Sequence, residues 1–274
     1  MAADTASSGD IQAQQRSPPE RQDPPPNKLH YLRPSYWDER FQGEQHYEWF
    51  KNYSHFRHLV LKHIKPTDRV LEVGAGSSRL SEDMYRDGIR HITCTDLSTV
   101  AVERMRERFV DLPGMVAAEA DMLNLPFDDE SFDVVIEKGA MDVLFVDCDD
   151  QWSPEPEVAK RVRGMLAEAH RVLNPTGVFI TIAFGQPHFR RPFFEAEGLT
   201  WSMKYETFGD NFHYFFYTLY KGTKDAGESF SLESMAVPLS LGMEHENMDS
   251  EDYLLQSGLS DDDDDDDEER ACQS

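Results

Sequence analysis

The chain has few cysteines and no long apolar run, and each absence argues against a class of protein. Its 274 residues include three cysteines, which stand far apart and without the spacing of metal ligands. We therefore expect a reduced intracellular setting, with the cytoplasm as the default. No stretch of about 18 apolar residues occurs, so a membrane-spanning helix is not expected. The four histidines between residues 46 and 63 lack a cluster of cysteines or carboxylates at ligand spacing, and no metal site is expected.

Basic charge is also scarce. The chain has 27 lysines and arginines against 52 acidic residues, a formal net charge of −25, which argues against a nucleic-acid substrate because phosphate binding needs a basic face. The acidic excess is greatest in residues 222–274, which we expect to form a disordered tail that is solvated, attracts a basic partner, or serves as a phosphorylation-linked docking segment. Residues 1–27 are rich in Ser, Gln and Pro, and we expect them to be disordered and to lack a targeting signal.

Between these tails, residues 28–221 alternate strand-like and helix-like stretches. Apolar runs predict strands over residues 68–73, 90–96, 114–120, 132–138 and 177–184. Helices are predicted over residues 47–64, 77–86, 98–109 and 157–173, the first of them covering a sheet edge. Two aromatic runs on either side of residues 209–211 predict a closing hairpin. The expected fold is α/β, a doubly wound, seven-stranded and mostly parallel sheet with an antiparallel C-terminal hairpin.

The stretch "VLEVGAGSSRL", residues 70–80, predicts a ligand-binding loop. In an open parallel sheet ligands bind beyond the carboxyl ends of the strands, where Gly74 and Gly76 allow a tight turn and close backbone approach. Asp96 ends the next strand and is suited to accept hydrogen bonds from ribose hydroxyls. The third glycine of the dinucleotide pattern is absent, and Glu72 precedes the loop. By itself the loop is equally compatible with a structural turn.

Other residues extend this candidate site. Asp121 and Met122 follow the third strand, where they would meet an adenine through its exocyclic amine and an apolar or backbone contact. Lys138 ends the fourth strand and would pair with a ligand carboxylate, with Glu137, or with another surface group.

Motif order carries a family resemblance. "LEVGAGSSRL", "CTDLS", "EADMLNLPFDDESFDVVIEKG" and "VLNPTGVFI" resemble the successive motifs of class I S-adenosylmethionine-dependent methyltransferases over residues 68–184. "YWDERF", "YEWF", "IEKGAMD" and "PHFR" extend the resemblance over residues 30–221, to the methyltransferase-like lysine methyltransferases of translation elongation factor one-alpha. The resemblance implies S-adenosyl-L-methionine as cofactor and a protein substrate, that elongation factor or a similar protein.

The resemblance also implies which residues contact the cofactor. They are Trp37, Phe41, Trp49, Gly74, Asp96, Leu97, Asp121, Met122 and Lys138, to which the glycine-rich loop adds Glu72 and Gly76. Phe41 stands where a tyrosine is expected, so a hydroxyl is missing there. The two tryptophans fit equally well as core residues or as rings that attract a sulfonium through cation–π contact.

A lysine acceptor has an ordinary pKa of about 10.4 and must lose a proton before it attacks a methyl group. Glu137 and Asp142 are expected to flank the opening and are the candidate catalytic carboxylates, although each also fits a purely local pairing role. The acceptor cleft is expected between residues 185–194 and the hairpin aromatics Phe212, Tyr214 and Phe216. A small-molecule methyltransferase and a noncatalytic adapter that uses the acidic tail remain alternatives, and no oligomeric state follows from the sequence.

Overall fold

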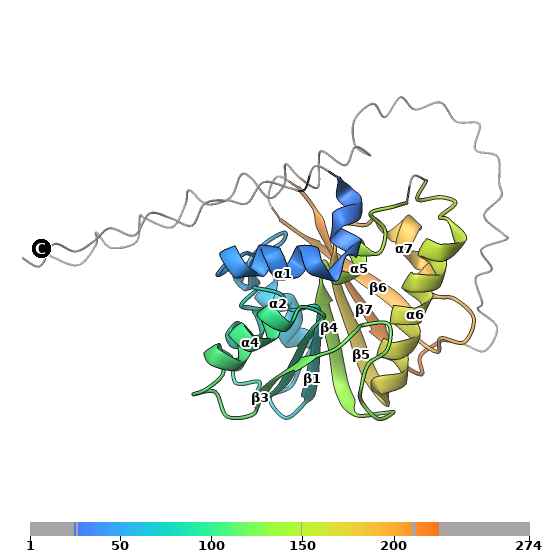
Figure 1. The fold of residues 1–274 in the computed structure, drawn as a ribbon. Coiled ribbons are helices and arrows are strands. Elements are labelled where there is room, and N and C mark those ends of the chain that lie inside the picture. Colours follow the sequence, from blue (N-terminus) through green and yellow to red (C-terminus); the bar gives the residue numbers. More distant parts are fainter. Residues whose placement is uncertain (1–24, 26, 149, 210–211, 225–274) are drawn as a thin grey trace, which may run out of the picture.

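Seven strands form one sheet at the centre of the fold (Figure 1), in the order β3-β2-β1-β4-β5-β7-β6. The computed structural model describes residues 25, 27–148, 150–209 and 212–224. The strands are β1 (Arg69–Val73), β2 (His91–Asp96), β3 (Met115–Glu119), β4 (Phe132–Lys138), β5 (Leu173–Ala183), β6 (Ser202–Phe208) and β7 (Tyr214–Tyr220). β1 to β5 pair in parallel, whereas β7 runs antiparallel to both β5 and β6. The predicted fold class is confirmed.

Helices cover both faces of the sheet (Figure 1). They are η1 (Lys28–Leu32), α1 (Pro34–Gly43), α2 (Tyr53–His63), α3 (Leu80–Arg86), α4 (Thr99–Arg108), α5 (Ala140–Val143), α6 (Pro156–Val172) and α7 (Pro187–Phe194). Side chains alternate along a strand, so Val70 of β1 packs in the core with α2 and α4, while Leu71 packs in the core with α6 and α7. Burial on both faces explains why the parallel strands read as continuous apolar runs.

The helix predicted over residues 47–64 is wrong at its start, because α2 begins at Tyr53. The side-chain oxygen of Asn52 caps that helix by accepting a backbone hydrogen bond at 3.2 Å. Phe50 has a φ of 67°, which a right-handed helix does not allow. Residues 47–52 are therefore irregular, and they are free to follow the edge of the sheet where the central strands end.

Four short helices, η1, α1, α5 and α7, were not predicted. α1 and α7 each begin with a proline in the first turn, Pro34 and Pro187, where the missing amide hydrogen costs nothing. Each has ten residues or fewer, too short for its apolar spacing to stand out from the surrounding sequence. α1 supplies residues that line the cavity described below, and α7 reaches that cavity through the hydrogen bond from Arg190 to Asp142.

The predicted C-terminal boundary at residue 221 falls three residues before the end of the described chain. The backbone amide of Lys224 donates to the Thr200 carbonyl at 2.9 Å, and its Nζ donates to the Glu195 carbonyl at 2.6 Å. Residues 222–224 therefore pack with the domain and not with a tail. The rest of both predicted tails, residues 1–24, 26 and 225–274, lies outside the described residues. Within the described part, no helix has the length and apolar character needed to cross a membrane.

Candidate active site

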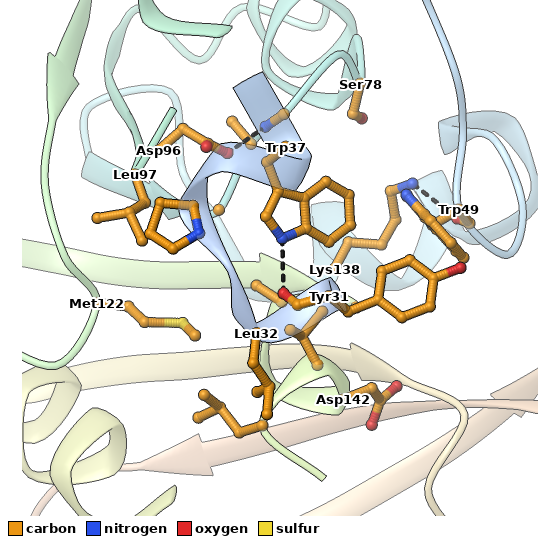
Figure 2. Close-up of a pocket in the computed structure, with 18 of the residues that line it drawn as sticks. Tyr31, Leu32, Trp37, Trp49, Ser78, Asp96, Leu97, Met122, Lys138 and Asp142 are labelled. Carbon is orange, nitrogen blue, oxygen red and sulfur yellow. Dashed lines mark hydrogen bonds between the residues drawn. The ribbon is translucent and has the colours of Figure 1, made fainter. Parts of the chain in front are cut away.

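A cavity of about 470 Å³ lies at the carboxyl ends of β1, β2 and β4, under side chains from residues 31–50 (Figure 2). Ligands bind at this edge in open parallel sheets, and pockets for small molecules typically measure about 300–1,000 Å³. The cavity is lined by all the residues predicted to contact a cofactor, namely Trp37, Phe41, Trp49, Glu72, Gly74, Gly76, Asp96, Leu97, Asp121, Met122 and Lys138. Of the two predicted catalytic carboxylates, only Asp142 lines it.

The glycine-rich loop is shaped by its backbone. Gly74 and Gly76 have φ angles of 67° and 53°, in the left-handed region that favours glycine. A Cβ at Gly74 would lie 2.5 Å from the Cβ of Ala140, so a side chain there would push the loop away from the start of α5. The loop can pass this close to the start of α5 only because position 74 is glycine, and a Cβ at Gly76 would instead meet the Phe41 ring at 3.0 Å.

Asp96 is held in a fixed orientation at the end of β2. One carboxylate oxygen accepts a hydrogen bond from the Gly76 amide at 2.8 Å, and the other accepts from the Ser98 amide at 2.9 Å. Burial raises the pKa of Asp96 to about 6, although these amide hydrogen bonds oppose the shift. Backbone amides thus fix the orientation of a carboxylate that lines the cavity.

Glu72 differs from Asp96 in its surroundings, although both line the cavity. Its side chain is buried and accepts a hydrogen bond from the Ser81 hydroxyl at the start of α3. Burial raises the pKa of Glu72 to about 7. These contacts tie β1 to α3 behind the glycine-rich loop, so Glu72 supports that loop from below.

The cover of the cavity is aromatic. The indole nitrogen of Trp37 donates to the Tyr31 carbonyl at 2.8 Å (Figure 2). The Trp37 ring stacks on Phe41 with centroids 5.6 Å apart. The Arg40 guanidinium lies 5.1 Å from the ring centroid of Trp49, a cation–π contact inside the protein. Tyr31 was missed by the sequence analysis because it precedes the first recognisable motif.

Lys138 pairs with a residue that the sequence analysis did not single out. Its Nζ donates to Glu48 at 2.7 Å and to the Trp49 carbonyl at 2.8 Å, so the predicted pairing with Glu137 is absent from its described contacts. Glu48 also accepts from the Arg79 amide at 2.8 Å. Burial acts to raise the pKa of Glu48, but the Lys138 charge and these hydrogen bonds hold that pKa below its ordinary value. Glu48 is the acidic residue of the motif "YEWF", and that motif was the only sequence signal that could have pointed to it.

Glu137 does not flank the opening, contrary to expectation. It is fully buried and accepts hydrogen bonds from the Met141 amide at 3.1 Å and from the Thr181 hydroxyl. Successive residues of a strand face opposite ways, so Lys138 faces the cavity and Glu137 faces the core under α6 and α7. Burial, reinforced by the charge of Asp142, raises the pKa of Glu137 to about 7.

Asp142 lies at the opposite end of the cavity from Asp96 and Leu97 (Figure 2). One of its oxygens accepts from the Phe184 amide at 2.9 Å and the other from Nη2 of Arg190 at 2.5 Å. Arg190 is buried and was not predicted as a site residue, although the motif "PHFR" contains it.

The predicted acceptor cleft is only partly supported. Tyr214 and Phe216 are buried in the sheet core and do not line the cavity, because both point to the face that packs against α2. Phe212 instead stacks on Phe184, with ring centroids 5.3 Å apart. Among the described residues, no group of three or more His, Cys, Asp and Glu side chains is arranged to hold a metal ion.

Comparisons with known proteins define the class. Residues 71–181 match a family model described as a methyltransferase domain. A protein solved in work on the conversion of a disulfide bond into a thioacetal group during echinomycin biosynthesis superposes with a TM-score of 0.54 and 18% identity, covering 70% of this chain and 94% of that one. Phosphoethanolamine N-methyltransferase 1 of Haemonchus contortus superposes with a TM-score of 0.51 and 14% identity, covering 76% and 52%. The chain is a methyltransferase with the class I fold.

Curated relatives narrow the class to a family. EEF1A lysine methyltransferase 4 of Bos taurus is 37% identical over 201 residues, which cover 72% of this chain and 79% of that protein. The protein of the same name from Mus musculus is 34% identical over 209 residues, covering 75% and 81%. This chain belongs to the EEF1A lysine methyltransferase 4 family.

Proposed function

We propose that this methyltransferase takes its methyl group from S-adenosyl-L-methionine and transfers it to a lysine side chain of translation elongation factor one-alpha, in the cytoplasm. The single observation that carries the cofactor assignment is that one cavity is lined by all eleven residues predicted to contact that cofactor. The acceptor assignment is supported by the names of the relatives in Bos taurus and Mus musculus.

The residues of the cavity fit the proposed cofactor in size and chemistry. The volume of about 470 Å³ suits a small molecule, and Leu97 and Met122 offer apolar surface for a base. Asp96 presents a carboxylate whose orientation is fixed by two backbone amides, as a pair of ribose hydroxyls requires. When bound, S-adenosyl-L-methionine supplies an activated methyl group on its sulfonium, and the protein supplies alignment and a dry site.

The chain's own residues divide this work. Asp96 would bind the ribose, Asp121 and Met122 would hold the adenine, and the backbone at Gly74 and Gly76 would hold the amino-acid end. The aromatic cover of Tyr31, Trp37 and Trp49 excludes water from above, and the pair of Lys138 and Glu48 holds that cover down.

Asp142 is the group of the cavity best suited to meet the acceptor. It lies at the end of the cavity away from Asp96, and its carboxylate can bind the incoming lysine ammonium and orient the amine. Methyl transfer needs the neutral amine, so the lysine ammonium must release its proton to water before it attacks; enclosure in a cavity favours this loss because burial disfavours the charged form. Glu137 takes no part in this contact, since the wall of the cavity separates it from the acceptor.

The proposal is tested by incubating the purified chain with radiolabelled S-adenosyl-L-methionine and recombinant elongation factor one-alpha, followed by mass spectrometry of the labelled band. We expect methylation of a lysine in that protein. Asp142→Asn should lower the rate about a hundredfold, the size of effect expected when the group that orients the acceptor amine is lost. Asp111→Asn, at an exposed position after α4, should leave the rate unchanged.

Three results would overturn parts of the proposal. Label confined to small molecules in a cell extract would point to a small-molecule acceptor on the same fold. Label on a protein residue other than lysine would refute the acceptor chemistry. Absence of cofactor binding in a calorimetric titration would refute the assignment of the cavity itself.

A further inference from the structure

The carboxylate of Asp142 has a hydrogen-bond donor on each oxygen. The Phe184 amide, just beyond the end of β5, donates to one oxygen at 2.9 Å. Nη2 of Arg190, from α7, donates to the other at 2.5 Å. Asp142 itself belongs to α5, so α5, the end of β5 and α7 meet at this one side chain. Such a carboxylate is fixed in position in a way that a carboxylate held by water is not.

Arg190 is enclosed to an unusual degree for an arginine. Only 3% of the residue is exposed, and its guanidinium carbon lies 3.8 Å from the ring centroid of Phe145. Nε and Nη1 are buried without a hydrogen-bond partner in the described part of the chain. A buried cation is costly unless it is paired, and its one ion-pair partner there is Asp142. The two unpartnered nitrogens still cost stability, and that cost favours a role for Arg190 in the site.

The close approach of Arg190 depends on a glycine. A Cβ at Gly185 would lie 2.3 Å from the guanidinium carbon of Arg190 and equally close to two of its nitrogens. The guanidinium thus occupies the space that any larger residue at position 185 would fill. Tyr217, on β7, closes the same region by donating its hydroxyl to the Gly185 carbonyl at 2.6 Å.

We infer that Arg190 is a positioning residue, which holds the Asp142 carboxylate in the orientation that receives the acceptor amine. The inference rests on the proposed function, because it assigns the acceptor end of that same cavity. Arg190 does not line the cavity and acts through Asp142. Supporting hydrogen bonds of this kind set how well a group in direct contact with substrate is aligned, and a misalignment of about 1 Å can cost about a hundredfold in rate.

A double-mutant cycle tests the inference. The wild type, Asp142→Asn, Arg190→Met and the double variant are compared by kcat and KM for transfer to elongation factor one-alpha, and by calorimetric affinity for S-adenosylhomocysteine. We expect Arg190→Met to lower kcat at least tenfold while cofactor affinity changes less than twofold. The double variant should be no slower than Asp142→Asn, because two residues that act as a unit are non-additive. Arg190→Lys should recover part of the loss.

Controls in the same chain separate positioning from folding. Arg191→Met removes the neighbouring arginine, whose side chain is 41% exposed and pairs with Glu195, and should leave kcat unchanged. Gly185→Ala should reproduce a weaker form of the Arg190→Met defect, since the added methyl group displaces the guanidinium. Gly164→Ala is its matched control, because a Cβ there would meet its nearest neighbour at an ordinary 3.8 Å.

The outcomes distinguish this inference from the proposed function. If the wild type does not methylate the elongation factor, the proposed function fails and the inference falls with it. If the wild type is active but the two losses multiply in the double variant, Arg190 acts independently of Asp142 and the inference alone is refuted. A parallel loss of S-adenosylhomocysteine affinity in Arg190→Met would also refute it, since that result assigns Arg190 to the cofactor end.

Discussion

The two ends of the cavity are built by different means. At one end, both Asp96 oxygens are held by backbone amides, from Gly76 at a sequence separation of 20 and from Ser98 at a separation of two. At the other end, one Asp142 oxygen is held by the side chain of Arg190, 48 residues away. Backbone donors survive most substitutions, whereas a side-chain donor is lost with one. The proposed cofactor end therefore follows from the fold, and the proposed acceptor end follows from particular residues.

The substitution Glu137→Gln is expected to have the largest effect on stability. It tests whether this buried carboxyl, next to Asp142, takes up a proton in the folded chain. Burial raises its pKa from an ordinary 4.5 to about 7, so the folded chain holds this proton more tightly than the unfolded chain. The Glu137 contribution to stability is therefore fully present below pH 4.5 and is lost as the pH rises toward 7. Between pH 5 and pH 8, we expect the free energy of unfolding of Glu137→Gln to rise relative to wild type by about 2 kcal/mol.

The measurement is chemical denaturation of both proteins at several pH values. Glu168→Gln is a suitable control, because hydrogen bonds and charge from Arg171 hold the pKa of Glu168 below its ordinary value and give its pH dependence the opposite sign. Parallel stability curves for the wild type and Glu137→Gln would show that Glu137 is ionised throughout, and would contradict the assignment of a buried protonated carboxyl.

Asp96→Ala tests the cofactor end with a smaller effect. Loss of the carboxylate should weaken binding of S-adenosyl-L-methionine at least tenfold, about 1.4 kcal/mol, because two ribose hydroxyls lose their acceptor. Isothermal titration calorimetry measures this directly, with Asp111→Ala as the exposed control. An unchanged affinity would show that Asp96 does not contact the cofactor.

Truncation of the C-terminal segment, which does not line the cavity in the described part of the chain, should have the smallest effect on cofactor binding. A chain that stops after Lys224 should bind the cofactor within about twofold of the full protein, since the cavity lies within the described residues. A chain that stops after Lys221 loses the hydrogen bonds of residues 222–224 to the loop before β6, and should unfold about 3 °C lower in a thermal melt. Equal melting temperatures for the two truncations would restore the boundary predicted from the sequence.

The same contrast explains which parts were predictable. The parallel strands and the loop from Gly74 to Gly76 are specified by neighbouring residues, so an apolar run or a glycine pair predicts them. Glu48 and Arg190 are single charged residues in motifs of other character, and only the tertiary fold brings them to Lys138 and Asp142. The error at Glu137 arose because its motif does not tell which face of the strand each residue occupies.

A ligand that enters the cavity from the side of the covering segment must first break the contacts of Glu48. Its carboxylate joins the covering segment to Lys138 on β4 and to the Arg79 amide ahead of α3. The Arg79 amide is therefore protected from exchange with solvent deuterium only while the cover is in place. Its exchange rate reports how often the entrance opens, and a ligand that fills the cavity should slow that exchange in proportion to its affinity.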